Sequence, residues 1–231
     1  AELRESSSFS PLPRYWVNSK DCASAMDRFD LTGSLLIYRN IARSTDERTL
    51  IAAVVPRVAV GHGSPIIIPT SHSDCHLLAC LLTSVVLDFV ARQKLGGTNL
   101  TFNLVQQFAI PTPASFRESP AFIRQPLRTF VHHRVLELAY TAWDMEPFAL
   151  ELEDSGSPFR WDEERRVILR AELDAACFHL YGITSREDVD YILGTFPIVN
   201  RKDRERFGEE RTRRLVLENY DRMTEATRTG V

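Results

Sequence analysis

The spacing of apolar and polar residues predicts short strands in the first part of the chain. Short runs rich in β-branched residues and bounded by turn residues predict strands over residues 35–38, 50–60 and 66–68. Residues 98–105 alternate apolar and polar side chains, which predicts a fourth strand. Before it, Ser73 or Asp74 can cap a helix that continues to about Lys94 and that Gly96 and Gly97 end through positive φ angles. These elements predict a small mixed sheet with one packed helix.

The second part of the chain has the three-to-four-residue period of helices almost throughout. It predicts helices over residues 130–143, 163–181, 186–193 and 203–227. Asp162 and Ser185 are expected to cap two of them, and Gly182 to stop the first. Apolar stripes mark their buried sides, with Leu169, Leu173, Ala176 and Leu180 on one helix and Val216, Tyr220 and Met223 on another. The fold class predicted for the whole chain is therefore α+β.

These patterns divide the chain into three predicted parts. Residues 1–30 are polar and irregular, and we expect a connector arm in which Tyr15 and Trp16 pack. Residues 31–113 form an α/β subdomain, and residues 114–231 form a helical subdomain.

Composition limits the classes of protein that fit. The chain has 231 residues, of which 44% are hydrophobic, so it can bury a substantial core. The net charge of -3 gives no general positive field, so any contact with a polyanion has to come from a local patch. The four cysteines form no CxxC pair, which is typical of reduced thiols, and the apolar run 77–90 is too short to cross a bilayer. We expect a cytoplasmic protein without a membrane role and, because it begins with Ala1, a piece of a longer one.

The most distinctive polar segment is residues 39–49, called the arginine turn here, which lies between two apolar runs. Arg39, Arg43 and Arg48 each carry a planar fork of donors that suits phosphate or a guanine edge. Thr45 lies among them and adds a short hydroxyl donor. Two interpretations are open, a recognition loop on a rigid scaffold and a solvated turn in which the arginines pair with neighbouring acids.

A second polar segment, residues 92–99, is called the glycine loop here. Two cations are followed by two glycines, where a backbone can approach a ligand, and then by two polar side chains. A phosphate or a base edge fits this arrangement. The alternative is equally physical, because cations at the C-terminus of a helix complement its dipole and glycine commonly ends helices.

Motifs for catalysis or metal binding are absent from the sequence. It has no GxxxxGK[ST], GxSxG or HExxH motif, and no Asn-Pro-Pro-Tyr-type motif. Zinc is disfavoured because the spacing of His72, Cys75, His76 and Cys80 fits no standard pair of ligand knuckles. His62 is interpreted as a turn residue, and 132–133 as surface histidines. We therefore expect no active site within this chain, and no cofactor.

The order of these segments resembles a known family. The residues that carry the resemblance are Arg39-x-Ile41-x-Arg43-x-Thr45-Asp-Glu-Arg48-Thr49, Val55-Pro56-Arg57, 65–69, Leu87-Asp88-Phe89, Arg92-x-Lys94-x-Gly96-Gly97-x-Asn99-Leu100 and Ile110-Pro111, followed by helical segments at 134–144, 159–165, 174–182 and 188–193. Over about residues 12–225 the chain resembles the C-terminal target-recognition region of adenine-specific DNA methyltransferases. More narrowly, it is similar to the single-chain methylases of restriction-modification and phage-defence systems of the type IIG, BREX or DISARM kinds.

The resemblance implies double-stranded DNA as one partner and an N-terminal methyltransferase domain of the parent protein as another. S-adenosylmethionine would belong to that domain and not to this chain. The implied DNA contacts are Arg39, Arg43, Thr45, Arg48, Arg92, Lys94, Gly96, Gly97, Thr98 and Asn99. Two other hypotheses are a protein-docking module in which the arginines are structural, and a self-contained nuclease, for which the sequence shows no carboxylate cluster.

Overall fold

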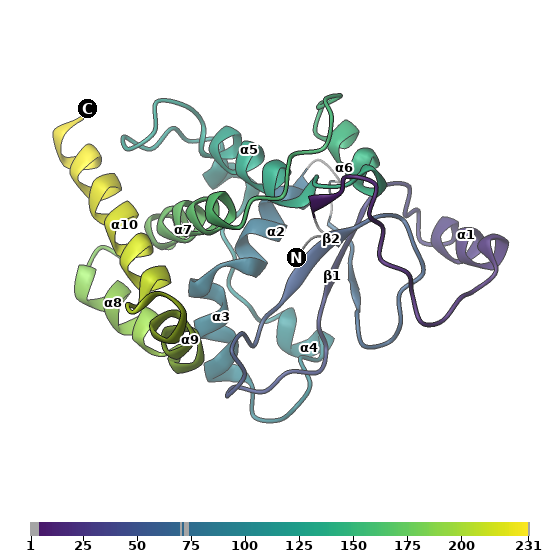
Figure 1. The fold of residues 1–231 in the computed structure, drawn as a ribbon, viewed down its shortest axis with the longest axis horizontal. Coiled ribbons are helices and arrows are strands. Elements are labelled where there is room, and N and C mark those ends of the chain that lie inside the picture. Colours follow the sequence, from purple (N-terminus) through teal and green to yellow (C-terminus); the bar gives the residue numbers. More distant parts are fainter. Residues whose placement is uncertain (1–4, 70, 72–73, 231) are drawn as a thin grey trace.

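The computed structural model describes residues 5–69, 71 and 74–230. A small sheet and helix α1 lie on one side, helices α7 to α10 lie on the other, and α2 and α3 stand between them (Figure 1). The predicted α+β class is confirmed. The strands are β1 (Leu35–Tyr38), β2 (Ala52–Val55) and β3 (Ile66–Ile67). The helices are α1 (Ser19–Asp27), α2 (Cys75–Thr83), α3 (Val85–Lys94), α4 (Phe102–Val105), η3 (Pro113–Phe116), α5 (Leu127–Ala139), η4 (Trp143–Met145), α6 (Glu146–Glu151), α7 (Glu163–Leu180), α8 (Arg186–Gly194), α9 (Pro197–Phe207) and α10 (Arg211–Thr229).

The sheet has the order β2-β1-β3, with β1 in the centre. Leu36 lies opposite Val54 of β2 and Ile67 of β3, and both pairings are antiparallel. The predicted sheet was mixed, so this detail was wrong. The bounds of β1 agree with the prediction, whereas β2 is much shorter than residues 50–60.

The fourth predicted strand, residues 98–105, was wrong. Only Asn99 pairs, in an isolated antiparallel bridge with Ile41, and Phe102–Val105 is the short helix α4. Both edges of β1 are occupied by β2 and β3, so residues 98–105 cannot pair along the central strand. The buried Leu100 is also followed at intervals of four residues by Leu104 and Phe108, which pack against the same core. This spacing fits a helix as well as the two-residue period fits a strand.

The single helix predicted from Ser73 or Asp74 to Lys94 is two helices, α2 and α3, bent by 64° at Ser84. The Ser84 backbone is extended, and its hydroxyl accepts a hydrogen bond from the Leu87 N–H (3.3 Å). Ser73 lies outside the described residues. Asp74 occupies the N-cap position, but its carboxylate pairs with Arg128 (2.5 Å) instead of capping.

Glycine does not end α3 in the expected way. Its C-cap is Leu95 in an extended conformation, and among the described residues the glycines with positive φ are Gly182, Gly208 and Gly230. The positive φ angles expected at Gly96 and Gly97 were therefore wrong.

The predicted caps in the helical part are confirmed. The Asp162 side chain accepts a hydrogen bond from the Arg165 N–H (3.0 Å), and the Ser185 hydroxyl accepts one from the Asp188 N–H (3.1 Å). The helix predicted at 130–143 lies slightly earlier, at Leu127–Ala139. The long helix predicted at 203–227 is divided into α9 and α10 at Gly208, whose φ of 75° ends α9.

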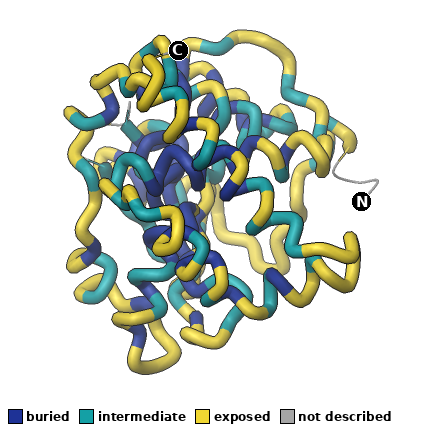
Figure 2. The backbone as a smooth tube through the Cα atoms, turned by 90° about the vertical axis from the view of Figure 1, so that its left-hand side faces the viewer, coloured by how far each residue is buried: buried dark blue, intermediate teal, exposed yellow. Residues whose placement is uncertain are grey.

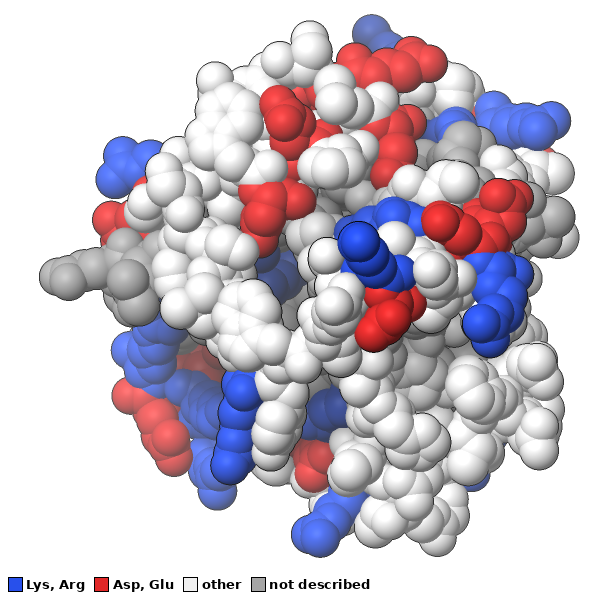
Figure 3. Space-filling model, turned by 90° about the vertical axis from the view of Figure 1, so that its right-hand side faces the viewer, with Lys and Arg blue, Asp and Glu red and all other residues white. Residues whose placement is uncertain are grey.

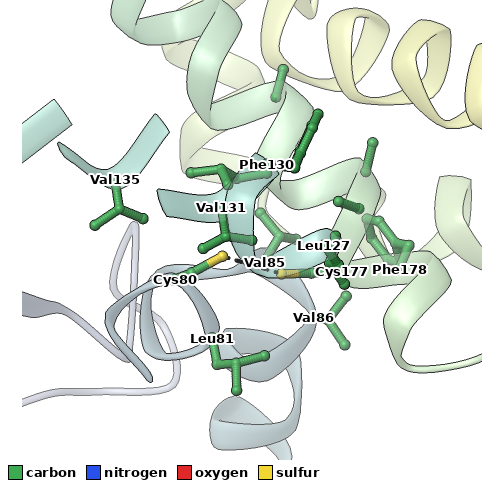
Figure 4. Packing of buried hydrophobic residues seen from close by; sticks show 14 of the residues in the cluster. Cys80, Leu81, Val85, Val86, Leu127, Phe130, Val131, Val135, Cys177 and Phe178 are labelled. Carbon is green, nitrogen blue, oxygen red and sulfur yellow. Dashed lines mark hydrogen bonds between the residues drawn. The ribbon is translucent and has the colours of Figure 1, made fainter. Parts of the chain in front are cut away.

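Buried residues are concentrated in the middle of the molecule (Figure 2). One apolar cluster joins α2 and α3 to the helical part, and a second joins them to the sheet. In the first cluster, the sulfur atoms of Cys80 on α2 and Cys177 on α7 lie 3.8 Å apart (Figure 4). The predicted division into residues 31–113 and 114–231 remains a prediction, and α2 and α3 contribute to both clusters.

The predicted arm, residues 1–30, contains helix α1, so it is not irregular throughout. Arg57 joins this helix to the sheet, donating to the Asp27 carboxylate and to the Leu31 carbonyl, each at 2.5 Å. Tyr15 and Trp16 are 78% and 74% exposed. The expectation that these two rings pack was therefore wrong.

Candidate nucleic-acid interface

The arginine turn is closed by its own side chains. One Asp46 carboxylate oxygen accepts a hydrogen bond from the Arg39 guanidinium (2.9 Å) and another from the Arg43 N–H (3.2 Å). The Thr49 hydroxyl donates to the Arg43 carbonyl (2.9 Å), and Arg39 also donates to the Arg48 carbonyl (2.8 Å). These bonds give the turn a fixed shape before any ligand binds.

A buried carboxylate fixes the turn to helix α3. Asp88 is fully buried, and its Oδ1 atom accepts hydrogen bonds from the backbone N–H groups of Thr49 (3.0 Å) and Leu50 (2.9 Å). Its Oδ2 atom accepts one from Nε of Arg48. Three donors therefore compensate the burial of this charge. Arg48 also donates to the Thr83 carbonyl (2.7 Å), so it joins the turn to both α2 and α3.

Arg92 of α3 also binds the arginine turn, through the backbone carbonyls of the turn. Its guanidinium donates to the carbonyls of Asp46 (2.6 Å), Glu47 (2.7 Å) and Thr195 (3.0 Å). It also lies 4.1 Å from the centre of the Phe196 ring, in a cation–π contact. Burial lowers the pKa of Arg92, with the carboxylate of Asp88 partly opposing this shift. This side chain is 7% exposed, so its donors serve the fold.

The five predicted cations therefore fall into two groups. The guanidinium groups of Arg39, Arg48 and Arg92 bond within the protein. Arg43 and Lys94 are exposed, and neither side chain forms an ion pair or hydrogen bond with another described residue. Of the five predicted cations, Arg43 and Lys94 are therefore the two whose side-chain donors are all available to a ligand.

The arginine turn and the glycine loop meet beyond the end of β1, beside α4 (Figure 1). The Ala42 N–H donates to the Thr98 carbonyl (3.0 Å), and the Leu100 N–H donates to the Asn40 carbonyl (2.7 Å). These two bonds make a short antiparallel ribbon of residues 40–42 and 98–100, called the ribbon here. The two polar segments that the sequence separates by about fifty residues thus form one surface.

The remaining predicted contacts are all exposed on or beside the ribbon. They are Thr45, Gly96, Gly97, Thr98 and Asn99. At each of the two glycines, an added Cβ would meet no described atom within 4 Å, so the space above the loop is open. The backbone there is accessible to a ligand even though neither glycine has a positive φ.

The predicted contacts do not include two residues that shape this surface. Ile41 is 65% exposed at the centre of the ribbon, and Asp88 anchors the turn from behind. Both had a signal in the sequence. Ile41 is a large apolar residue within a polar turn, and Asp88 is an acid inside an apolar helical run.

A cavity of about 640 Å³ lies between the arginine turn and the helical part. Arg48 lines one side and Arg170 of α7 another, while Phe196 lies in its apolar wall. Asp174 also lines it, accepting a hydrogen bond from the Val85 N–H (2.8 Å), and burial raises the pKa of this carboxyl to about 6. Basic and acidic side chains both line the cavity, so its charge selects no single class of ligand.

Charges of both signs are interspersed on the face that carries α1, with uncharged surface between them (Figure 3). That face shows no continuous positive patch in the part drawn in colour. The histidines and cysteines weighed as zinc ligands form no group of three or more ligating side chains within the described part of the chain, and His72 lies outside it. Among the described helices, none alone has the length and apolar content needed to cross a membrane, whereas the bent pair α2 and α3 does by length and composition.

Comparison with protein-family models, with curated proteins and with solved structures finds no match to this chain.

Proposed function

We propose that this chain is the DNA target-recognition part of an adenine-specific DNA methyltransferase in a restriction-modification or phage-defence system. The observation that carries the proposal is the ribbon, which joins the two polar segments expected to contact DNA and presents Arg43 beside the open glycine loop. Its fixed shape supports recognition, since a preformed surface loses little entropy on binding. The family resemblance of the sequence supports the identity of the ligand.

In this proposal the chain selects the DNA site and carries out no chemistry. The methyltransferase domain of the parent would bind S-adenosylmethionine and transfer the methyl group, and it would contact this chain as a second partner. The system would act in the cytoplasm, where its DNA substrate is found. Arg43 and Lys94 would neutralise phosphates, while Thr45, Thr98 and Asn99 would contact the groove or the backbone.

The salt dependence of binding tests the proposal. Each phosphate that a cation neutralises contributes about -0.9 to the slope of log K against log salt concentration. Arg43 and Lys94 together would give a slope of about -1.8, whereas all five predicted cations would give about -4.5. Fluorescence anisotropy with the whole chain and a pool of random duplexes, between about 50 and 200 mM salt, measures this slope.

Variants of equal charge make the test specific. Arg43→Ala is expected to reduce the steepness of the slope by about 0.9. Arg228→Ala, which removes an exposed arginine near the end of α10, is the matched control and is expected to leave the slope unchanged. Absence of duplex binding at the lowest salt concentration would rule out the proposal.

A second candidate function is a docking module for a partner protein. The observation in its favour is that Arg39, Arg48 and Arg92 bond within the protein, which leaves two of the five predicted cations for DNA. A docking module predicts no binding to duplex DNA at any salt concentration. The same titration therefore distinguishes the two functions.

A further inference from the structure

Ile41 and Asn99 form a pair at the centre of the ribbon. The hydrogen bonds of the bridge run between their neighbours, from Ala42 to Thr98 and from Leu100 to Asn40. Ile41 and Asn99 therefore make the non-hydrogen-bonded kind of antiparallel pair, in which the two side chains are close and lie on the same face.

The neighbouring residues hold this pair outward. Ala42 is 1% exposed and Leu100 is fully buried, and successive side chains of an extended segment point to opposite faces. Ile41 is 65% exposed, and Asn99 is exposed as well. A shift of one residue would expose Leu100 and bury the polar side chain of Asn99, so the core fixes the register.

The two side chains match the major-groove edge of an A·T base pair. A carboxamide both donates and accepts, which fits N7 and the N6 amino group of adenine. A branched apolar side chain fits the 5-methyl group of thymine, and the major groove admits a two-stranded ribbon. A G·C pair offers no methyl group, and guanine presents two acceptors at the same edge.

Resting on the proposed function, we infer that Ile41 and Asn99 read adenine and thymine in the target site, Asn99 through the adenine edge and Ile41 through the thymine methyl group. Arg43 follows Ile41 by two residues and is exposed, so it lies beside the pair. Its guanidinium contacts the DNA backbone next to the pair and sets the depth of the ribbon in the groove.

Base analogues test each contact separately. Duplexes bound by the whole chain are selected from a random pool, and thymine in the selected site is then replaced by deoxyuridine, or adenine by 7-deazaadenine. Removal of one methyl group is expected to weaken binding about fourfold. Removal of the adenine N7 atom is expected to weaken it about fivefold or more.

Variants identify the side chains responsible. Ile41→Ala is expected to bind thymine and deoxyuridine duplexes equally, and Asn99→Ala is expected to be insensitive to 7-deazaadenine. Ile68→Ala and Asn103→Ala, which alter exposed residues of the same types off the ribbon, are the controls and keep the sensitivity of the original chain. Circular dichroism and the melting temperature verify that every variant is folded.

The outcomes separate this inference from the proposed function. Salt-dependent binding whose selected sites lack A·T pairs, or whose analogue sensitivity survives in Ile41→Ala and Asn99→Ala, overturns the inference and leaves the proposed function standing. No duplex binding at low salt overturns both. Loss of each sensitivity only in its own variant supports the inference.

Discussion

Asp88 is the residue whose replacement tests most directly how the arginine turn is held. In Asp88→Ala, the N–H groups of Thr49 and Leu50 lose their acceptor inside the protein, and Arg48 loses its ion pair. Breaking a buried ion pair by removing one partner costs about 3–5 kcal/mol. Because a domain of this kind is stable by about 5–15 kcal/mol, this is a large part of the free energy of unfolding.

Asp88→Asn removes the charge of this side chain and keeps its size and shape. The amide oxygen still accepts from the two backbone N–H groups, but the amide nitrogen then faces Nε of Arg48, and two donors oppose each other. Loss of this charge-assisted hydrogen bond is expected to reduce the free energy of unfolding by about 1.5–3 kcal/mol. Glu118→Gln, which makes the same change from carboxylate to amide at an exposed position, is the control.

Urea denaturation measures these free energies, and hydrogen exchange locates the effect. The Thr49 and Leu50 amides are expected to exchange faster in Asp88→Ala than in the original chain, because their acceptor is gone. An Asp88→Asn variant within about 0.5 kcal/mol of the original chain would behave as a surface substitution. That result would refute the view that this carboxylate anchors the turn.

Three further predictions follow from single residues. Arg43→Ala is expected to weaken duplex binding by about 1–3 kcal/mol in anisotropy titrations, unlike Arg228→Ala, and equal affinities would contradict its role. Gly208→Ala places a side chain at a φ of 75° and is expected to lower the free energy of unfolding by about 1 kcal/mol in urea, whereas no loss would show that α9 ends without this glycine. Burial raises the pKa of Asp174 to about 6 in the folded chain, above its ordinary value of about 3.8, so its ionisation costs the full penalty to folding above about pH 6. This penalty disappears as the pH falls towards 4. Asp174→Asn keeps an acceptor for the Val85 N–H. It is expected to raise the free energy of unfolding in urea at pH 8 by at most about 3 kcal/mol and to leave it unchanged at pH 4. The same difference between variant and original chain at both pH values would contradict this.

Much of the local structure followed from the sequence. The caps at Asp162 and Ser185 depend on side chains within three residues of the N–H groups that they accept from, so their positions were predictable. The central strand β1 was predicted with its observed bounds from a short apolar run beside a turn. The prediction for residues 98–105 failed because the central strand is already paired on both edges, and Leu100, Leu104 and Phe108 pack against the core at helical spacing. The prediction for residues 203–227 failed because Gly208 ends α9.

For the candidate site, the sequence by itself determined where the two polar segments lie and which hydrogen-bond donors and charges their side chains carry. It did not determine which of these donors remain free of partners within the protein. Arg48 is bonded to an acid forty residues away, and Arg92 to carbonyls of the turn and of Thr195. These pairings follow from the packing of α3 against the turn and α8.

The tertiary structure alone decided that, of the five predicted cations, Arg43 and Lys94 have side chains without a partner among the described residues, and that Ile41 and Asn99 lie side by side. The physical reason is the distance along the chain. A helix cap or a turn depends on residues that are neighbours in sequence, whereas the partner of a charged side chain is whichever group folding brings within about 4 Å of it. Burial of Ala42 and Leu100 then fixes which face of the ribbon remains in water.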